Sequence, residues 1–403
     1  MLKQTRDQAR QTVCRQLDRI ATVSAAGGRR KASILVRRFL WADTVKLDAA
    51  FRVLGEAVSF EEAAELAGRI DLFQPCERAV TWWRIPKRTT GSRIVCQLPS
   101  EVRAAHLIIL DVLQAQFRPG HHLYGVKGRG RDELARSLRA AMEQGRGYAI
   151  QGDIREAFSN VDVDSLYDIL PLPAAVIRHM LDYRNLRLRH DPTRDKAQVS
   201  SAPCGPLSIR GTYLSVPTQV NGPTGLLAGF PASNLILAIA LAGLSDVLPP
   251  GCAPYLYADN VLVAARTEEE CRRIEPMLIR YFAEHPAGPF TLDKIAIDSL
   301  DAGIGFLGYA FERDLEGEVA IIPNQRGYND IIVTCCRAAE AAAAAGRVKP
   351  ETRHLIRQKL SGFSATTDPE WIYTWVGEMM NESFNEVVWA QERGHWPPGL
   401  RTS

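Results

Sequence analysis

The chain has 403 residues, of which 46% are hydrophobic and 24% are charged, and its net charge is only +3. These proportions are typical of a globular protein with room for two or three domains, and they exclude a disordered or fibrous chain. The longest apolar run, residues 235–244, is too short for the roughly 20 residues of a membrane span, and the N-terminus lacks a signal-peptide core. We therefore expect a cytoplasmic protein without a membrane partner. The eight cysteines show no CxxC spacing, so neither a zinc module nor a redox pair is indicated.

The first 75 residues have apolar side chains at helical spacing and an excess of basic side chains. Residues 1–50 hold eleven Lys or Arg and four Asp, a local excess of +7. Such a face can bind nucleic-acid phosphates, although a solvated helix surface has the same composition. If it binds an RNA backbone, affinity should fall steeply with ionic strength, and removal of residues 1–40 should reduce that dependence.

Downstream, the pattern changes to a mixture of strands and helices. Residues 84–98 predict two extended segments around a Thr-Thr-Gly-Ser turn, and residues 100–118 and 132–145 predict helices. A polar segment with Pro and Gly at 189–223 has the composition of an insertion, and residues 328–392 are predicted to be helical.

Two aspartates are predicted to lie at strand ends. An apolar run leads into Asp153, and apolar residues on both sides of Asp259 and Asn260 predict a strand–turn–strand. Either aspartate alone is more often a cap or turn residue than a metal ligand. Together they can meet on neighbouring strands of one sheet, where two carboxylates can hold a pair of Mg²⁺ ions for phosphoryl transfer.

Between these aspartates, a glycine-bearing loop leads into an apolar helix. The loop begins at Gly225 and contains Gly229, and Ser233 lies near the predicted start of the helix. Such a loop lets the backbone approach a ligand closely, but an ordinary loop capped by Ser233 fits the same residues.

Six motifs in this order resemble those of the reverse transcriptase family, of the bacterial type found in group II introns, retrons and defence systems. The resemblance covers about residues 84–310 and continues more weakly to about residue 392. The motifs are Ile85-Pro-Lys87 with Gly91-Ser-Arg93-Ile94, Tyr124-Gly125-Val-Lys127, Asp153 with Phe158, Gly229-Phe-Pro-Ala-Ser233, Tyr257-Ala-Asp259-Asn260, and Gly305-Phe-Leu-Gly308-Tyr309.

The resemblance implies an α+β right-hand polymerase with fingers, an antiparallel-sheet palm and a helical thumb. Residues 1–83 would then be a basic helical N-terminal region, 84–145 the fingers, 146–325 the palm with its insertion, and 326–403 the thumb. It also implies an RNA-directed DNA polymerase, a nucleotidyltransferase that uses Mg²⁺ and dNTPs to make DNA on an RNA template.

The resemblance assigns the catalytic residues to the palm. Asp153, Asp259 and the backbone carbonyl of Ile154 would be metal ligands, and Lys294 would protonate the departing pyrophosphate, although the family usually has a longer spacer before this lysine. Asn260 stands where most members have a second Asp. Because its amide is neutral and offers one oxygen, we expect weaker Mg²⁺ binding or a shift in preference toward Mn²⁺.

The resemblance assigns a second set of residues to the substrate. Lys87 and Arg93 would neutralise the triphosphate, Gly229 and Ser233 would shape the nucleotide pocket, and the ring of Phe158 would leave no room for a ribose 2′-hydroxyl. Because Phe158 would exclude the 2′-hydroxyl, the preferred substrate should be a dNTP. Alternatively, Lys87 and Arg93 are ordinary surface cations and Phe158 is a core residue.

The sequence departs from the family at two further places. Leu227-Ala228 stands where many members have Pro-Gln, and Gly128-Arg129-Gly130 displaces the usual order of glycine and arginine. No His/Asn-rich nuclease, Cys-rich module or NAxxH segment is visible in the 403 residues. These features favour the defence-associated or unassigned group, whose members often act with a non-coding RNA against phage. A retron or mobile-element enzyme, a catalytically degenerate RNA-binding scaffold and a two-metal nuclease are the alternatives.

Overall fold

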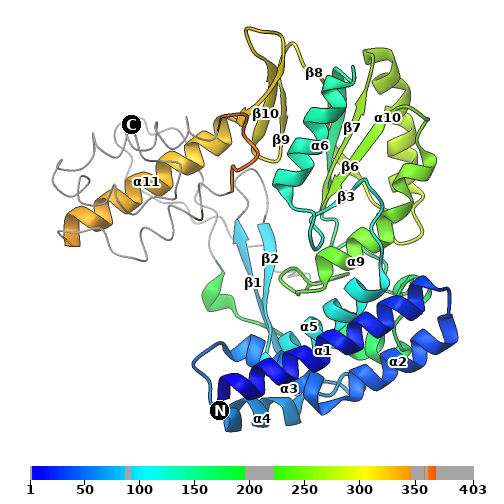
Figure 1. Ribbon diagram of the computed structural model, residues 1–403, viewed down its shortest axis with the longest axis vertical. Coiled ribbons are helices and arrows are strands. Elements are labelled where there is room, and N and C mark those ends of the chain that lie inside the picture. The colour runs from blue at the N-terminus through cyan, green and yellow to red at the C-terminus, as the bar shows by residue number, and fades with distance from the viewer. Residues whose placement is uncertain (1, 87–91, 196–221, 346–357, 359–361, 369–403) are drawn as a thin grey trace. The chain divides into compact units, whose positions relative to one another are not determined.

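The computed structural model describes residues 2–86, 92–195, 222–345, 358 and 362–368 (Figure 1). The chain divides into two compact units, each assembled from three separate stretches. The first unit comprises Met1–Gly120, Ile154–Gly243 and Tyr281–Thr291, and the second comprises His121–Asp153, Leu244–Arg280 and Leu292–Ser403. The boundaries of these two units differ from those of the four consecutive domains expected from the sequence. The four domains stay a prediction.

The first unit is built on packed helices at its N-terminal end. They are α1 (Leu2–Ala25), α2 (Arg29–Trp41), α3 (Asp43–Leu54), α4 (Phe60–Arg69) and α5 (Ser100–Gln116). Helix α3 contacts α1, α2, α4 and α5, because its apolar residues, including Val45 and Phe51, are fully buried. The prediction of helices in residues 1–75 and 100–118 is confirmed.

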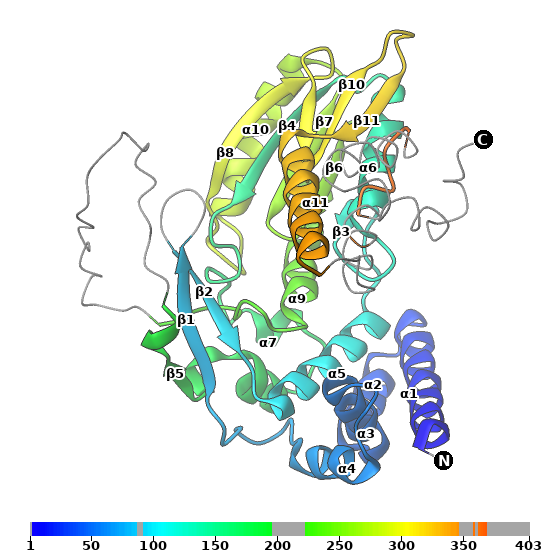
Figure 2. The ribbon, with the colours of Figure 1, turned by 90° about the vertical axis from the view of Figure 1, so that its left-hand side faces the viewer.

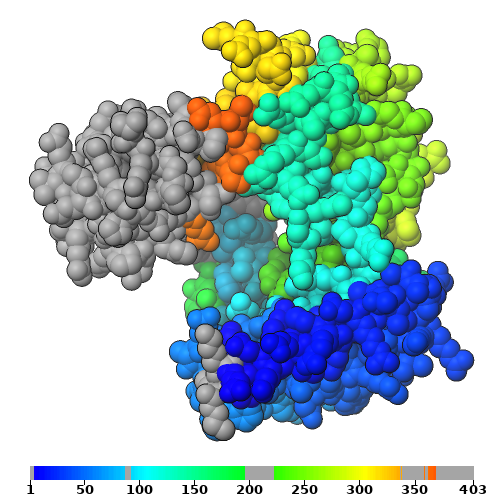
Figure 3. Space-filling model, viewed as in Figure 1, coloured from blue at the N-terminus to red at the C-terminus, as the bar shows by residue number. Residues whose placement is uncertain are grey.

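Two buried aspartates lie among the N-terminal helices of the first unit, and arginines neutralise them. Asp48 of α3 and Asp111 of α5 are 4% and 7% exposed. Arg10 of α1 lies 3.0 Å from Asp48, and Arg52 lies 2.5 Å from Asp111. Arg10 therefore belongs to the helix packing, whereas the basic residues of α2 are exposed. Figure 3 shows the N-terminal helices in dark blue on the surface of this unit.

A three-stranded sheet follows the helices in the first unit. Strands β1 (Val80–Pro86) and β2 (Ser92–Gln97) pair antiparallel, which confirms the two extended segments predicted at 84–98. Strand β5 (Leu188–His190) pairs parallel with β1, so the start of the segment expected to be an insertion belongs to this sheet. The Trp82 ring stacks on His190 at 4.2 Å and anchors it there. Residues 196–221 of that segment lie outside the described residues.

The second unit contains a five-stranded sheet in the order β3-β6-β7-β4-β8. Its strands are β3 (Leu123–Tyr124), β4 (Tyr148–Ile154), β6 (Ala253–Tyr257), β7 (Asn260–Ala265) and β8 (Leu292–Ser299). Figure 2 shows β8, β4, β7 and β6 side by side. Strands β6, β7 and β4 are antiparallel, as the resemblance implies, and the short β3 joins β6 in parallel.

A helix and a second sheet complete the core of the second unit. Helix α6 (Arg131–Glu143) packs on β6, β7 and β11, and its position confirms the helix predicted at 132–145. Strands β9 (Ile304–Phe306), β10 (Tyr309–Arg313) and β11 (Val319–Pro323) form the antiparallel second sheet. One apolar cluster joins α6 to both sheets, with Leu138, Leu262 and Phe311 among its fully buried members.

The segment predicted as a helical thumb is helical over part of its described length. Helix α11 (Gln325–Ala345) begins directly after β11. Residues 362–368 form turns instead of the expected helix, because the Thr367 N–H donates to Ile321 O of β11 at 2.9 Å. The predicted thumb tryptophans at 371, 375 and 389 lie outside the described residues. No helix in the described ranges is both long and apolar enough to cross a membrane.

Candidate active site

The five-stranded sheet brings the two predicted carboxylate segments together. Strands β4 and β7 are antiparallel neighbours, and Asp153 lies directly opposite Asn260. Tyr257 pairs with Asn260 across a two-residue turn, so Ala258 and Asp259 form its tip. Ala258 has a φ of +53°, which is unusual for a residue with a side chain and stores strain at functional turns. The predicted strand–turn–strand is confirmed.

The Asn260 amide binds the neighbouring carboxylate. Its Nδ2 donates to Asp259 Oδ1 at 2.8 Å and makes a longer contact of 3.4 Å with Tyr257 O. The amide therefore fixes the orientation of Asp259 within the turn. An aspartate at this position would have no proton to donate and would oppose a second anion.

Lys294 reaches Asp153 from the next strand of the sheet. Lys294 is in β8, has a φ of +53°, and places Nζ 2.5 Å from Asp153 Oδ2. This hydrogen bond, followed by the attraction of the Asp153 charge, raises the pKa of Lys294 above its ordinary value. The Lys294 side chain is 71% exposed, so the ammonium is accessible from solvent while it neutralises Asp153.

A cavity of about 550 Å³ contains these groups. Asp153, Asn260 and Lys294 line one part of it, and the turn at residues 305–308 lines another. Arg131, Arg326 and Phe363 also line it, although the sequence reasoning assigned them no role. The cavity thus combines carboxylates with three cationic side chains, a composition suited to a ligand that carries phosphates and metal ions.

The turn between β9 and β10 has a defined conformation. Leu307 and Gly308 both have positive φ, at +51° and +89°, and Tyr309 pairs with Phe306 across them. This is the pattern of a type I′ hairpin, for which glycine at the second central position is favourable. The Gly305–Tyr309 motif is therefore a tight turn at the cavity wall.

Arg131, at the start of α6, supports this turn. Its guanidinium carbon lies 4.9 Å from the centre of the Tyr309 ring and 4.7 Å from that of Phe363. Its Nη1 is 3.4 Å from Leu307 O. Such cation–π contacts each contribute roughly 0.5–2 kcal/mol. Arg131 joins three segments that are far apart in the sequence.

The described turn at 362–368 is bound to the same place by hydrogen bonds. Tyr309 Oη donates to Asp132 Oδ1 at 2.7 Å, and Ser364 Oγ donates to Asp132 Oδ2 at 2.5 Å. Burial, followed by the bond to Asp132, raises the pKa of Tyr309. The side chains of Arg131, Asp132, Tyr309, Phe363 and Ser364 are called the turn clasp below.

The donor set at the strand ends suits Mg²⁺. Asp153 and Asp259 supply carboxylate oxygens, and magnesium in phosphate-transfer sites is commonly held by one or two carboxylates together with substrate phosphates. The described residues contain no group of three or more His, Cys, Asp or Glu placed to hold a metal ion. Ile154 is the buried last residue of β4, and the role of its carbonyl stays a prediction.

The predicted substrate residues fall in the first unit and are described separately from the carboxylates. Arg93 is exposed on β2, and Lys87 lies outside the described residues. Phe158 is half-buried, and its carbonyl accepts the Leu226 N–H at 2.8 Å. A Cβ on Gly225 would lie 2.3 Å from Phe158 O, so only glycine permits this approach. Gly225 thus holds the predicted glycine loop against Phe158.

Ser233 stabilises the loop that precedes its own helix. It is the first residue of α9 (Ser233–Ala240), whose N-cap is Ala232, so Ser233 is not the cap that the bland alternative required. It is 4% exposed, and its Oγ donates to Leu227 O at 3.1 Å. Gly229, with a φ of +97°, lies in the same loop. The structure therefore gives Ser233 a positioning contact within the loop.

Comparisons with known proteins give structural matches only. No protein-family model and no curated protein matches the sequence. An apo telomerase from Candida tropicalis, truncated from its C-terminal domain, is 11% identical with a TM-score of 0.40, over 62% of this chain and 56% of that chain. A Candida albicans telomerase in complex with a fragment of telomeric RNA is 11% identical with a TM-score of 0.35, over 80% and 62%.

A viral enzyme is the third similar structure. The Sicinivirus RNA-dependent RNA polymerase is 12% identical with a TM-score of 0.43, over 78% of this chain and 71% of the viral chain. The chain therefore spans less than two thirds of both telomerases and somewhat more of the viral polymerase. At these TM-scores and identities the function has to be inferred from the chain's own residues. Membership of the bacterial reverse transcriptase family stays a prediction.

Proposed function

We propose that the chain is an RNA-directed DNA polymerase whose catalytic carboxylates are Asp153 and Asp259. The observation that carries the proposal is the pairing of Asp153 with Asn260 on adjacent strands, which places Asp259 one residue from that pair. Lys294 provides a cation beside Asp153. Asp153, Asn260 and Lys294 line the cavity that the turn at 305–308 also lines. The six sequence motifs support the same activity.

Asp153 and Asp259 would hold Mg²⁺, with the Ile154 carbonyl as a further ligand and Mn²⁺ as the alternative ion. When bound, the ions stabilise negative charge on the attacking and leaving oxygens of an in-line phosphoryl transfer. Asp153 lies on β4 and Asp259 on the turn directly before β7, so the β4–β7 register places both carboxylates at the same end of the sheet. Such preorganisation avoids reorganisation during the reaction.

Lys294 would act as the general acid. In the transfer, a 3′-hydroxyl gives up its proton to solvent and its oxygen forms a bond to the α-phosphorus, the bond from that phosphorus to the bridging oxygen breaks, and pyrophosphate leaves. The departing oxygen needs a proton, and the raised pKa of Lys294 keeps its ammonium protonated at neutral pH. The Lys294 side chain is 71% exposed beside Asp153, so its ammonium would be accessible to the leaving group.

The nucleotide contacts are proposed from the resemblance. Arg93 would bind the triphosphate through its planar fork, and Phe158 would select dNTPs by excluding a 2′-hydroxyl. Phe158→Val should then raise the incorporation of ribonucleotides relative to deoxyribonucleotides in the same extension assay. A partner non-coding RNA as template and a role in anti-phage defence complete the proposal, and both rest on the resemblance.

A degenerate RNA-binding scaffold is the second candidate. It is favoured by the neutral Asn260 beside Asp259 and by Ala228 in the glycine loop, where the family pattern has a polar glutamine. The scaffold hypothesis assigns no chemical role to the Lys294 ammonium beside Asp153. It predicts RNA binding without DNA synthesis in either metal.

Primer extension on an RNA template separates the two candidates. The purified chain, together with any co-purifying RNA, is given dNTPs with Mg²⁺ or Mn²⁺, and the RNA and any DNA product are sequenced. Asp153→Asn and Asp259→Asn should each reduce extension by about a hundredfold or more while RNA binding by anisotropy is retained. Asp301→Asn, which removes an exposed carboxylate of the same unit, is the matched control. RNA binding without extension in either metal would refute the polymerase.

A further inference from the structure

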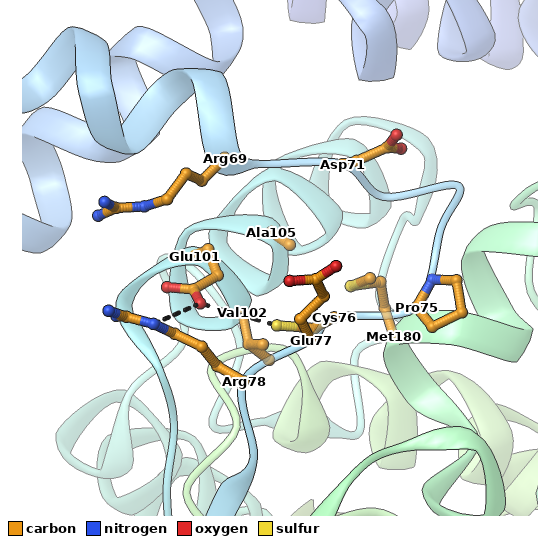
Figure 4. Close-up of a pocket in the computed structure, with 10 residues that line it drawn as sticks. All are labelled: Arg69, Asp71, Pro75, Cys76, Glu77, Arg78, Glu101, Val102, Ala105 and Met180. Atoms are coloured by element: carbon orange, nitrogen blue, oxygen red, sulfur yellow. Dashed lines mark hydrogen bonds and ion pairs between the residues drawn. The ribbon is translucent and has the colours of Figure 1, made fainter.

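A second cavity, of about 310 Å³, lies wholly within the first unit (Figure 4). It is formed by the segment that joins α4 to β1 and by the first turns of α5. Cys76, Glu77 and Arg78 line it from the connecting segment, and Glu101 and Val102 line it from α5. None of the residues implicated in nucleotidyl transfer belongs to this cavity.

Glu101 has an unused acceptor atom at the cavity. Its side chain is 9% exposed, and Oε2 has no hydrogen-bond partner among the described residues. The other oxygen, Oε1, lies 3.8 Å from Cys76 Sγ and 3.5 Å from Arg78 Nε, and Figure 4 shows both contacts. A buried carboxylate oxygen without a hydrogen-bond donor destabilises the fold. A ligand with an N–H donor would remove this cost.

The other charged groups of the cavity make it an acceptor for cations. Arg69 is already bound to Glu65 at 2.6 Å, so its charge is compensated outside the cavity. Arg78 forms an ion pair with Glu101, and its side chain is 62% exposed. Asp71 and Glu77 add two further carboxylates to the lining; Asp71 accepts the Phe73 N–H at 2.8 Å, and Glu77 is exposed. The groups with remaining capacity are therefore anionic acceptors.

The remaining wall of the cavity is apolar. Val102, Ala105 and Met180 line it beside the carboxylates. A metal ion does not suit this arrangement, since no three metal-ligating side chains of the described residues gather here. An alkyl chain that ends in a guanidinium or ammonium would suit it, because the stem can pack on the apolar wall while the head reaches Glu101.

We propose that this cavity binds an alkyl guanidinium or ammonium group, as carried by an arginine side chain of a partner protein or by a free small amine. The guanidinium donates to Glu101 Oε2 and Glu77, and its methylene stem lies against Val102 and Met180. Arg78 is the internal competitor, because its own guanidinium partly neutralises Glu101. This site is independent of the proposed polymerase activity.

Calorimetric titration of the full chain tests the site. The probe is Nα-acetyl-arginine amide, and the neutral Nα-acetyl-citrulline amide is its matched control. Saturable binding of the arginine probe alone is expected, and Glu101→Gln should weaken it by about tenfold or more. Glu61→Gln, an exposed glutamate of α4 that does not line the cavity, should leave it unchanged.

Arg78→Gln distinguishes this site from a purely structural glutamate. If Glu101 serves only the N-terminus of α5, this variant loses an ion pair and gains no ligand. The proposal predicts the opposite result, which is tighter binding of the arginine probe by about threefold or more. No saturable binding to the parent chain, or weaker binding in Arg78→Gln, would overturn it. Equal affinity for agmatine would identify a free amine as sufficient, and preference for the amide would indicate a protein-borne arginine.

Discussion

Asn260→Asp is predicted to destabilise the metal-free chain. The substitution replaces the Asn260 donor, 2.8 Å from Asp259 Oδ1, by a second carboxylate. Two unit charges about 4 Å apart interact by about 4 kcal/mol at an effective dielectric constant of about 20. Because both residues are half-buried at a turn tip, water screens part of this energy. We expect the free energy of unfolding in EDTA to fall by about 1–3 kcal/mol.

Divalent cations should reverse the effect. Urea unfolding of the parent chain and of Asn260→Asp is measured in EDTA and over a series of Mg²⁺ and Mn²⁺ concentrations. The variant has an additional anion at the proposed site, so its stability should rise more steeply with Mg²⁺ than that of the parent. In the extension assay, activity should shift from Mn²⁺ toward Mg²⁺ for the same reason.

Asn260→Ala is the matched control for the lost hydrogen bond. It should cost about 1 kcal/mol and should gain no additional stabilisation from Mg²⁺, since it adds no charge. If Asn260→Asp is as stable as the parent in EDTA, or responds to Mg²⁺ no more than Asn260→Ala, then residue 260 does not share a metal site with Asp259. The metal assignment would then have to be abandoned.

Three further predictions address other parts of the chain. Arg131→Met should lower stability in urea by about 1–2 kcal/mol and weaken binding of a primer–template, and Arg131→Lys should restore only part of each, because it keeps the charge without the planar stacking. Burial lowers the pKa of His106 to about 4, so its stabilising effect is complete above about pH 6.5 and is lost as the pH falls to about 4. Over this pH range the free energy of unfolding should fall by roughly 3 kcal/mol because of His106, and His106→Gln should not show this fall when unfolding is measured as a function of pH. Replacing Arg37 and Arg38 of α2 with Gln should reduce the salt slope of RNA affinity by about 1–2, and an unchanged slope would mean that this face is only solvated surface.

The placement of the carboxylates could be predicted from sequence because the signals are local. The apolar runs before Asp153 and around Asp259 define strands β4 and β7, each of which contains consecutive buried residues, as expected for strands inside a sheet. The polar pair within the second run defines the hairpin. The Asn260–Asp259 hydrogen bond follows from adjacency, but its donor geometry requires coordinates.

The turn clasp could not be predicted, because its contacts are non-local. Ser364 and Asp132 are 232 residues apart, and no periodicity of either segment indicates the other. Residues 362–368 have glycine and β-branched residues that disfavour a helix, a signal that the surrounding helical pattern concealed. Likewise, a glycine such as Gly225 occurs in many loops. Only the structure shows why glycine is required there, because a Cβ at this position would lie 2.3 Å from Phe158 O.

Some arginines of the N-terminal helices pair with buried aspartates, whereas others are exposed and available to bind RNA. Removal of residues 1–40, the deletion that the charge pattern suggests, would remove Arg10 and the buried α1 residues Val13 and Ile20. Asp48 and Asp111 would then share a single arginine, and breaking a buried ion pair costs about 3–5 kcal/mol. Such a deletion is therefore expected to unfold the first unit, and a loss of RNA binding would report misfolding. Exposed arginines of α2 separate the two effects, because their charges can be removed without touching the buried acids.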